Sequence, residues 1–289
     1  MSPPGPWARL VPSALRPFLT IPSLPSDRAG RLATILGVEP SELAAIRLGP
    51  RLHYRPHALA KPDGEPRRIL APSRALKRLQ RRLLDGYLAR IPVHPAATAY
   101  RRGGSALVHA RRHALGRVVA TVDLRDFFEA TRGARVARVF RAQGWRDEEL
   151  GVLMRLCTFR DGLPQGAPTS PCLSNLVNAR LDERLHALAM RSGANYSRYA
   201  DDLAFSWDAD RPPAGFARDA EELIRAAGYE VQPRKGWTIT RARDRPVVTG
   251  IILSGDGRLR VAGKRPRPSW LGWRPWQTWD AADAYRPGE

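Results

Sequence analysis

The sequence of 289 residues is 43% hydrophobic, which is enough for a folded core and excludes an intrinsically disordered chain. Its formal net charge of +20 indicates a polyanionic partner such as nucleic acid. There is no long apolar run, no secretory signal and only two cysteines, Cys157 and Cys172, so we expect a cytoplasmic protein, without a membrane span, whose thiols are buried and free.

The first third of the chain is expected to contain a leader segment, two helices and a hairpin. Residues 1–29 are rich in proline and aperiodic, which indicates a leader segment on the surface. The pattern then predicts a short helix at 40–49, a hairpin at 60–72 that turns at Asp63-Gly64, and a helix at 73–90 capped by Ser73.

The remainder mixes strands with helices. A β-branched apolar run within 116–128 predicts a buried strand that carries Asp123 at its tip. Further on, the pattern predicts helices at 146–157, 170–193 and 216–227, a hairpin around Asp201 and Asp202, and a strand at 247–253. This order favours an α+β architecture with an antiparallel sheet.

The stretch SRYADDLAFS, residues 197–206, places Asp201 and Asp202 side by side between apolar residues. Adjacent carboxylates repel each other, whereas Mg²⁺ binds oxygen ligands and would relieve the repulsion. Two such ions need a third carboxylate, and Asp123 is the best candidate if its strand lies beside the hairpin. Two metals about 3.5–4 Å apart would suit an in-line displacement at phosphorus. A solvated surface turn is the alternative, which the apolar flanks disfavour.

Several segments together resemble the bacterial retron-type reverse transcriptases. They are, in chain order, GEPRRILAPSRALKRLQ, VDLRDFF, LPQGAPTSPCLSN, RYADD and GYEVQPRKGWTITRARDRPVVTGIIL. The resemblance covers about residues 30 to 253, some three quarters of the chain. It implies a right-hand polymerase whose antiparallel palm sheet packs on helices. The implied domains are fingers and first palm helices at 30–115, the palm at 116–253, and a short Trp-rich tail at 254–289 in place of a full thumb.

The resemblance also implies roles for individual residues. Asp123, Asp201 and Asp202 match the catalytic acids that hold two Mg²⁺ ions, for which Mn²⁺ can substitute. Phe128 matches the aromatic gate that excludes a ribose 2′-hydroxyl, while Phe127 would pack in the core.

The other matched residues belong to the nucleotide-binding set. Lys61 and Arg67 match positions in the fingers that touch the triphosphate, although a solvated basic hairpin would explain them equally well. Gln165 and Gly166 match a loop that contacts the incoming nucleotide and the template, and Gly166 could also serve a turn before the next helix. Lys235 matches a palm lysine near the leaving pyrophosphate, where it could act as a general acid.

Two features depart from the family pattern. The segment HARRH, 109–113, keeps Ala110 and His113 of the retron Asn-Ala-x-x-His motif but has His109 in place of Asn, which leaves retron-specific RNA handling open. Only about 36 residues follow the last palm motif, fewer than a thumb needs, so we expect low processivity or a partner that completes the grip. Trp270, Trp273, Trp276 and Trp279 in that tail suit either base stacking or packing on the palm.

The expected function is therefore that of a retron-type RNA-directed DNA polymerase. It would copy a structured noncoding RNA into short RNA-linked DNA with dNTPs, and the family association adds anti-phage defence with an effector protein. The alternatives are a truncated RNA-binding scaffold without polymerase activity, a group II intron maturase, or another defence-associated reverse transcriptase. The scaffold is disfavoured because an unused site has no reason to keep three mutually repelling acids.

Overall fold

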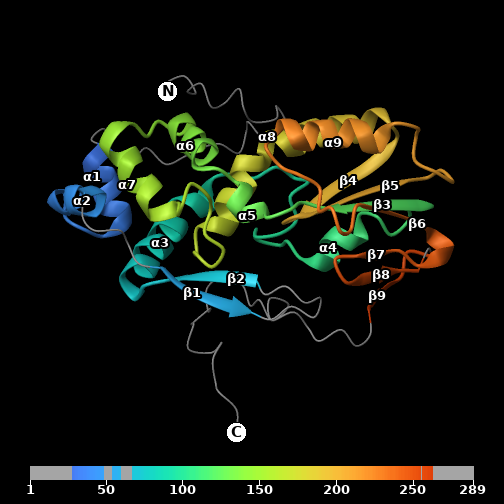
Figure 1. Ribbon diagram of the computed structural model, residues 1–289, viewed down its shortest axis with the longest axis horizontal. Coiled ribbons are helices and arrows are strands. Elements are labelled where there is room, and N and C mark those ends of the chain that lie inside the picture. The colour runs from blue at the N-terminus through green and yellow to red at the C-terminus, as the bar shows by residue number, and fades with distance from the viewer. Residues whose placement is uncertain (1–27, 49–53, 60–66, 255, 263–289) are drawn as a thin grey trace, which may run out of the picture.

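The computed structural model describes residues 28–48, 54–59, 67–254 and 256–262 (Figure 1). Most of the expected leader, Lys61, the Asp63-Gly64 turn and the four tryptophans of the tail lie outside these residues. Within the described part of the chain, no helix combines the length and the apolar character that a bilayer crossing demands.

One end of the molecule is a helical layer with its own hydrophobic core (Figure 1). It consists of α1 (Arg28–Leu36), α2 (Pro40–Leu48), α3 (Arg74–Gly86), α6 (Gly133–Ala142) and α7 (Asp147–Cys157). The helix predicted at 73–90 is confirmed: Ser73 caps α3 by accepting a hydrogen bond from the Leu76 amide at 3.4 Å, and a short 3₁₀ turn, η3 (Leu88–Arg90), follows. Leu76 and Leu83 are fully buried, as their helical spacing predicts.

A two-stranded hairpin extends from this layer. Strand β1 (Tyr54–Leu59) pairs antiparallel with β2 (Arg67–Pro72), so the predicted hairpin exists, although its first strand lies earlier in the chain than expected. Buried Gln80 of α3 donates a hydrogen bond to the Tyr54 hydroxyl at 2.8 Å and one to the Leu156 carbonyl at 2.7 Å. These bonds fasten β1 to α3 and α7.

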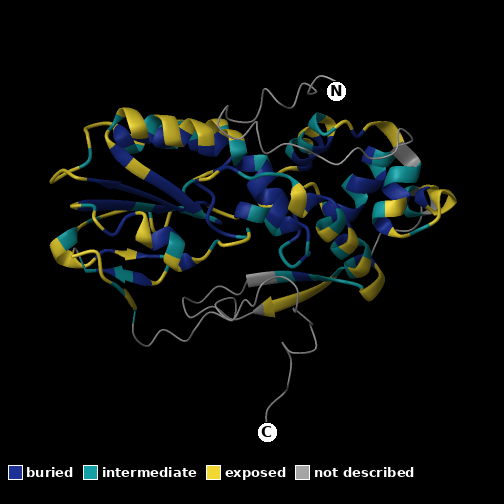
Figure 2. Ribbon diagram, turned by 180° about the vertical axis from the view of Figure 1, so that it is seen from behind, coloured by how far each residue is buried: buried dark blue, intermediate teal, exposed yellow. Residues whose placement is uncertain are grey.

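The other end is built on a four-stranded antiparallel sheet with the order β4-β5-β3-β6. The strands are β3 (Val118–Asp123), β4 (Ala194–Tyr199), β5 (Asp202–Trp207) and β6 (Trp237–Arg241). Helices α8 (Ser170–Arg191) and α9 (Phe216–Ala226) cover one face, and Phe205, Leu185 and Ile224 are among the residues of that core. Strands β3, β4 and β5 are largely buried between their covering layers, whereas the edge strand β6 is partly exposed (Figure 2). The predicted antiparallel α+β architecture is confirmed.

The opposite face of the sheet carries a smaller layer. Helix α4 (Ala106–Arg111) and a sheet of β7 (Val247–Val248), β8 (Ile251–Leu253) and β9 (Leu259–Val261) pack there against Val119 and Ala204. The single strand predicted at 247–253 is wrong, because Thr249 and Gly250 have φ of 47° and 78° and turn the chain into a hairpin. The remaining short elements are α5 (Phe127–Ala130) and η4 (Ala242–Asp244).

Both cysteines are buried and free, as predicted. Cys157 ends α7 and Cys172 lies in the first turn of α8. Burial raises the pKa of each thiol to about 12, so both stay protonated and act as small apolar side chains.

Candidate active site

A tight hairpin turn carries the paired acids. Tyr199 at the end of β4 pairs with Asp202 at the start of β5, which leaves Ala200 and Asp201 as the two turn residues. Ala200 is buried and has a left-handed φ of 58°, whereas Asp201 is not among the residues with positive φ. A positive φ at only the first turn residue is the pattern of a type II′ turn, which matches the twist of the flanking strands. The prediction that the acids lie at or beside a hairpin turn is confirmed.

Strand register brings the third acid opposite this hairpin. Asp123, the last residue of β3, is the direct cross-strand partner of Asp202 in β5. Directly opposed residues lie on the same face of a sheet with their Cβ atoms about 4.5–5.5 Å apart. The Leu124 amide also donates a hydrogen bond to the Asp201 carbonyl at 3.0 Å. The end of β3 and the turn are therefore held together by backbone as well as by register.

The pKa values of the two facing carboxyl groups, Asp123 and Asp202, are shifted in opposite directions. Burial raises the pKa of Asp202 well above its ordinary value, and the hydrogen bond with Asp123 and the negative charges of Asp201 and Asp123 raise it further. Burial also acts to raise the pKa of Asp123, but the hydrogen bond from Asp202 and the Lys235 ammonium outweigh it, so this pKa is lowered. When two carboxyl groups share a hydrogen bond in this way, one of them stays protonated unless a cation balances the second negative charge.

Lys235 supplies a positive charge to the acids. Its ammonium forms an ion pair with Asp123 Oδ2, although 62% of the Lys235 side chain is exposed. The Gln232 amide donates to the Asp123 carbonyl at 2.8 Å and the Lys235 amide donates to the Gln232 carbonyl at 3.2 Å, so the turn before β6 is attached to the end of β3. The structure thus brings Lys235 to Asp123, beside Asp202, while its expected role at the pyrophosphate stays a prediction.

The donor chemistry of this corner fits a hard divalent cation. Asp123 and Asp202 present only oxygen atoms, and Asp201 is close enough for its charge to raise the pKa of Asp202. In the residues that the structure describes, however, no group of three or more His, Cys, Asp or Glu side chains is already arranged as metal ligands. The meeting of Asp123 and Asp202 is observed, and the gathering of all three acids around metal stays a prediction.

The two phenylalanines after β3 have different surroundings. Phe127 is buried and stacks on Tyr229 with ring centroids 5.6 Å apart, so it belongs to the core. Phe128 is half-buried, with its ring centroid 6.2 Å from that of Tyr100. The Phe128 carbonyl accepts a hydrogen bond from the Leu163 amide at 3.0 Å, which connects it to the loop before α8. This arrangement matches the expected division of tasks, and the gate role of Phe128 stays a prediction.

The loop with Gln165 and Gly166 packs against the hairpin of β1 and β2. The Leu70 amide of β2 donates to the Gln165 carbonyl at 2.7 Å. Gly166 has a φ of 123°, and a Cβ there would lie 2.7 Å from the Leu70 carbonyl oxygen. Glycine is therefore required by the close approach of β2, a reason that neither of the sequence-based explanations contained. Arg67 begins the same strand, but its side chain, like the whole of Lys61, lies outside the description.

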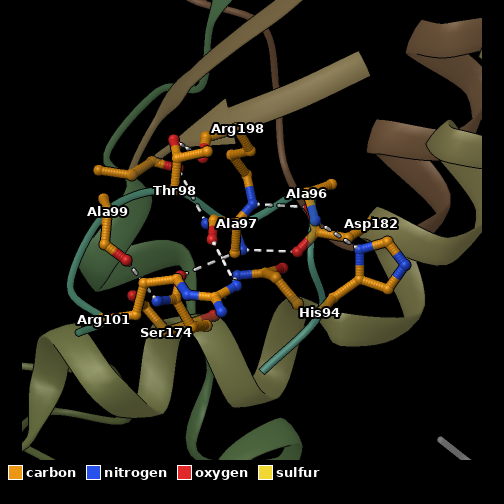
Figure 3. A network of polar contacts seen from close by, with 12 residues as sticks. His94, Ala96, Ala97, Thr98, Ala99, Arg101, Ser174, Asp182 and Arg198 are labelled. Atoms are coloured by element: carbon orange, nitrogen blue, oxygen red, sulfur yellow. Dashed lines mark hydrogen bonds and ion pairs between the residues drawn. The ribbon is translucent and has the colours of Figure 1, made fainter. Parts of the chain in front are cut away.

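A buried ion pair that sequence reasoning missed supports the hairpin turn (Figure 3). Fully buried Arg198 of β4 makes two bonds to Asp182 of α8, Nε to Oδ1 at 2.8 Å and Nη2 to Oδ2 at 2.7 Å. Its Nη1 donates to the Ala200 carbonyl at 3.1 Å, and its own carbonyl accepts from Thr98. The available signal was a charged residue at the alternate positions of β4 that also hold buried Ala194 and Tyr196. Arg198 thereby anchors the turn that carries Asp201.

The histidines of the HARRH segment belong to a buried polar chain beneath the same hairpin. His113 contacts Ser206 Oγ of β5 at 2.9 Å and Ser197 Oγ of β4 at 2.8 Å, and Ser197 Oγ contacts His109 Nδ1 at 2.8 Å. Burial lowers the pKa of His113 to about 3, with a further contribution from Arg112, and lowers that of His109 as well. Both rings are therefore neutral and structural in the folded protein.

The comparison with known protein families agrees with this fold and site. The family model described as reverse transcriptase (RNA-dependent DNA polymerase) matches residues 59–273, about three quarters of the chain. The chain belongs to the reverse transcriptase family, whose members have fingers and a palm.

Among curated proteins, the chain is similar in sequence to bacterial retron reverse transcriptases. It is 36% identical to the retron Mx162 reverse transcriptase of Myxococcus xanthus, over 83% of this chain and 56% of that protein. It is 32% identical to the retron Ec86 reverse transcriptase of Escherichia coli, over 70% of this chain and 63% of that protein. The chain thus spans between half and two thirds of the length of these relatives, and the predicted resemblance is confirmed.

Proposed function

We propose that this protein is an RNA-directed DNA polymerase that copies a structured noncoding RNA into short RNA-linked DNA. The observation that carries the proposal is the direct pairing of Asp123 with Asp202 beside a two-residue turn, in a chain of the reverse transcriptase family. The net charge of +20 supports a nucleic-acid template. Family type alone supports the retron product and a role in anti-phage defence with an effector protein.

The proposed chemistry assigns the acids to metal binding. Asp123, Asp201 and Asp202 would hold two Mg²⁺ ions, or Mn²⁺ in their place. When bound, the ions would offset the carboxylate charges and stabilise negative charge on the phosphoryl group that is transferred. Lys235 would leave Asp123 as the cations arrive and would hold positive charge, or donate a proton, near the leaving pyrophosphate. Its large exposed fraction supports this freedom to move.

The remaining assigned residues would position the incoming nucleotide. We assign Phe128 to the sugar gate, Gln165 and Gly166 to contacts with nucleotide and template, and Lys61 and Arg67 to the triphosphate. Phe128 and the loop before α8 are joined by the bond from the Leu163 amide, and that loop is joined to β2 by the bond from the Leu70 amide, which supports a shared nucleotide site.

The domain assignment follows the two cores. We assign the sheet of β3 to β6 to the palm, within the region 116–253 that the sequence indicated. Helices α6 and α7 lie inside that region but share a core with α1 to α3, so we assign them to the fingers together with β1 and β2. On this proposal the fingers are formed by two separate stretches of the chain.

The test is incorporation of labelled dNTP on a primed RNA template with Mg²⁺. Wild-type protein is expected to extend the primer, and Asp201→Ala is expected to lower the rate at least about a hundredfold, since a lost metal ligand removes several kcal/mol of charge stabilisation. Asp208→Asn is the matched control, because it removes an exposed carboxylate just beyond the far end of β5. Equal activity of wild type and Asp201→Ala would refute the metal assignment, and an inactive wild type that still binds RNA would favour the scaffold.

The retron assignment has a separate test. Nucleic acid that copurifies with the protein would be sequenced after RNase and DNase digestion in parallel. Short DNA joined to a structured RNA is expected from a retron enzyme. Intron RNA would instead identify a maturase.

A further inference from the structure

The turn between β7 and β8 has an unusual residue in its first position. Thr249 and Gly250 form the two-residue turn, and their φ of 47° and 78° are both left-handed. This is the pattern of a type I′ turn, which normally has Asn, Asp or Gly at its first position. A β-branched residue in the left-handed region is a strained outlier. Such outliers tend to persist where their side chains are needed.

The side chain of this strained residue reaches a catalytic acid. Thr249 Oγ1 donates a hydrogen bond to Asp202 Oδ2 at 3.4 Å, a long bond from a neutral donor. Asp202 is otherwise hydrogen-bonded to Asp123 and exposed to the charge of Asp201, both of which disfavour its ionised form. Thr249 therefore offers the Asp202 carboxylate a neutral hydrogen-bond donor, whereas its other hydrogen-bond partner, Asp123, is itself an acid.

The turn is also fixed in space relative to Asp202. Val248, Ile251 and Leu253 on either side of the turn are buried against α4 and the sheet. Their hydrophobic cluster includes Ala204, which lies two residues after Asp202 on the same strand and the same face. The Gly250 carbonyl accepts a hydrogen bond from the Ala262 amide at 3.0 Å. The hydroxyl is therefore held by a packed element and not by a free loop.

We infer that Thr249 is a positioning residue that fixes the orientation of the Asp202 carboxylate. The inference rests on the proposed function, in which Asp202 is a metal ligand. Glycine at this position would relieve the backbone strain but would bring no donor. Asparagine would relieve it too, but its donor would sit one bond further from the backbone. Threonine combines a donor at the γ position with the bulk that limits its rotation, which explains why a strained residue is retained here.

The experiment compares three substitutions of Thr249 in the full chain. Thr249→Val keeps the β-branch and removes the donor, so the affinity for Mn²⁺ alone, measured by electron paramagnetic resonance, is expected to fall about fivefold to tenfold. The kcat for dNTP incorporation should fall by a similar factor with KM for dNTP unchanged. Thr249→Ser keeps the donor and should stay within about twofold of wild type in both quantities.

Thr249→Gly separates positioning from a merely structural role. Because glycine adopts positive φ without strain, this variant is expected to raise the Tm while lowering Mn²⁺ affinity as much as Thr249→Val does. Thr34→Val in α1 is the matched control: Thr34 is exposed, its hydroxyl donates to the Gly30 carbonyl of the same helix, and Mn²⁺ affinity should not change.

Three results would overturn the inference. They are wild-type Mn²⁺ affinity in Thr249→Val, a parallel fall of Tm and affinity in Thr249→Gly, and wild-type Mn²⁺ binding that Asp202→Asn does not weaken. Failure of the proposed function looks different. If the wild type incorporates no dNTP while Thr249→Val still weakens Mn²⁺ binding, the polymerase proposal fails and the positioning role stands.

Discussion

At the scale of single residues, the acids depend on a buried support that has no catalytic chemistry of its own. Arg198 and Asp182 are both fully buried, and the pair connects α8 with the carbonyl of Ala200 in the turn. A buried ion pair gains little over a well-packed apolar pair, but removal of one partner leaves an uncompensated charge. Compared with an apolar pair, the ion pair therefore adds little to the free energy of unfolding, and its main effect is to fix the position of the turn.

Removal of the Arg198 guanidinium tests this support. Arg198→Ala is expected to lower the free energy of unfolding by about 3–5 kcal/mol, because Asp182 is left charged and unpaired in the core. The double variant Arg198→Met with Asp182→Leu should recover much of the loss. Urea denaturation followed by circular dichroism measures both. A single-variant loss below about 1 kcal/mol would mean that solvent reaches Asp182, contrary to its burial.

The buried histidines make stability depend on pH. Burial and Arg112 lower the pKa of His113 to about 3, whereas an unfolded histidine titrates near pH 6.5. Between these values the unfolded chain binds a proton that the folded chain does not. Protonation of His113 in the unfolded chain therefore costs no stability above about pH 6.5. Below that pH, the free energy of unfolding should fall by about 1.4 kcal/mol per pH unit, and His109 should make the slope steeper.

Urea denaturation at pH 7.5 and at pH 5.5 measures this slope. His113→Asn removes one of the titrating groups, so its slope should be smaller than that of the wild type even though the variant is less stable throughout. Carboxylates that titrate in the same range would affect both proteins alike. An identical slope in the two proteins would contradict the assignment.

At the scale of secondary-structure elements, local sequence patterns were sufficient to predict those strands and helices whose conformation depends on their own residues. The β-branched run of β3, the alternation around Asp201 and the Ser73 cap were all visible in the sequence, and the structure has each. The run VVTGIIL was misread as one strand because threonine favours strands and only Gly250 indicated a turn.

What could not be predicted depends on partners far away in the chain. The Asp123–Asp202 register joins residues 79 positions apart. Asp123 could be named as the candidate third acid only on the condition that its strand lies beside the hairpin, and the resemblance of the motifs supported that condition. Gly166 needs its glycine because of Leu70, which belongs to a hairpin almost a hundred residues earlier. Thr249 and Arg198 likewise act on the acids through contacts that arise only when separate elements pack together.

The close approach of β2 to Gly166 gives a prediction at this scale. Gly166→Ala is expected to lower the free energy of unfolding by about 2–3 kcal/mol, because its φ of 123° is unsuited to alanine and its Cβ would meet the Leu70 carbonyl. Gly144→Ala is the matched control, since Gly144 has a φ of 90° with open space around its Cβ position. Chemical denaturation of both variants separates the contact from the backbone strain. Equal losses would show that the contact with β2 has no effect.

At the scale of the whole molecule, the charge of +20 has a measurable consequence for nucleic-acid binding. Binding that neutralises about six phosphates should weaken about a thousandfold between 50 and 200 mM salt, because condensed counterions are released on binding. A filter-binding titration of a structured RNA across that range measures the slope of log affinity against log salt. A slope near zero would mean that the basic residues do not contact phosphates.

Helix α8 joins the two ends of the molecule in a way that bears on cooperativity. Its first turns, with Cys172, Leu173 and Leu176, belong to the helical core, and Leu181, Leu185 and Ala189 further along belong to the core under the sheet. If either core unfolded, part of α8 would lose its packing contacts. Because α8 is one continuous helix, this loss would also weaken the other core. The described halves should therefore unfold in one calorimetric transition, and a fragment containing only one of them would lack part of its interior.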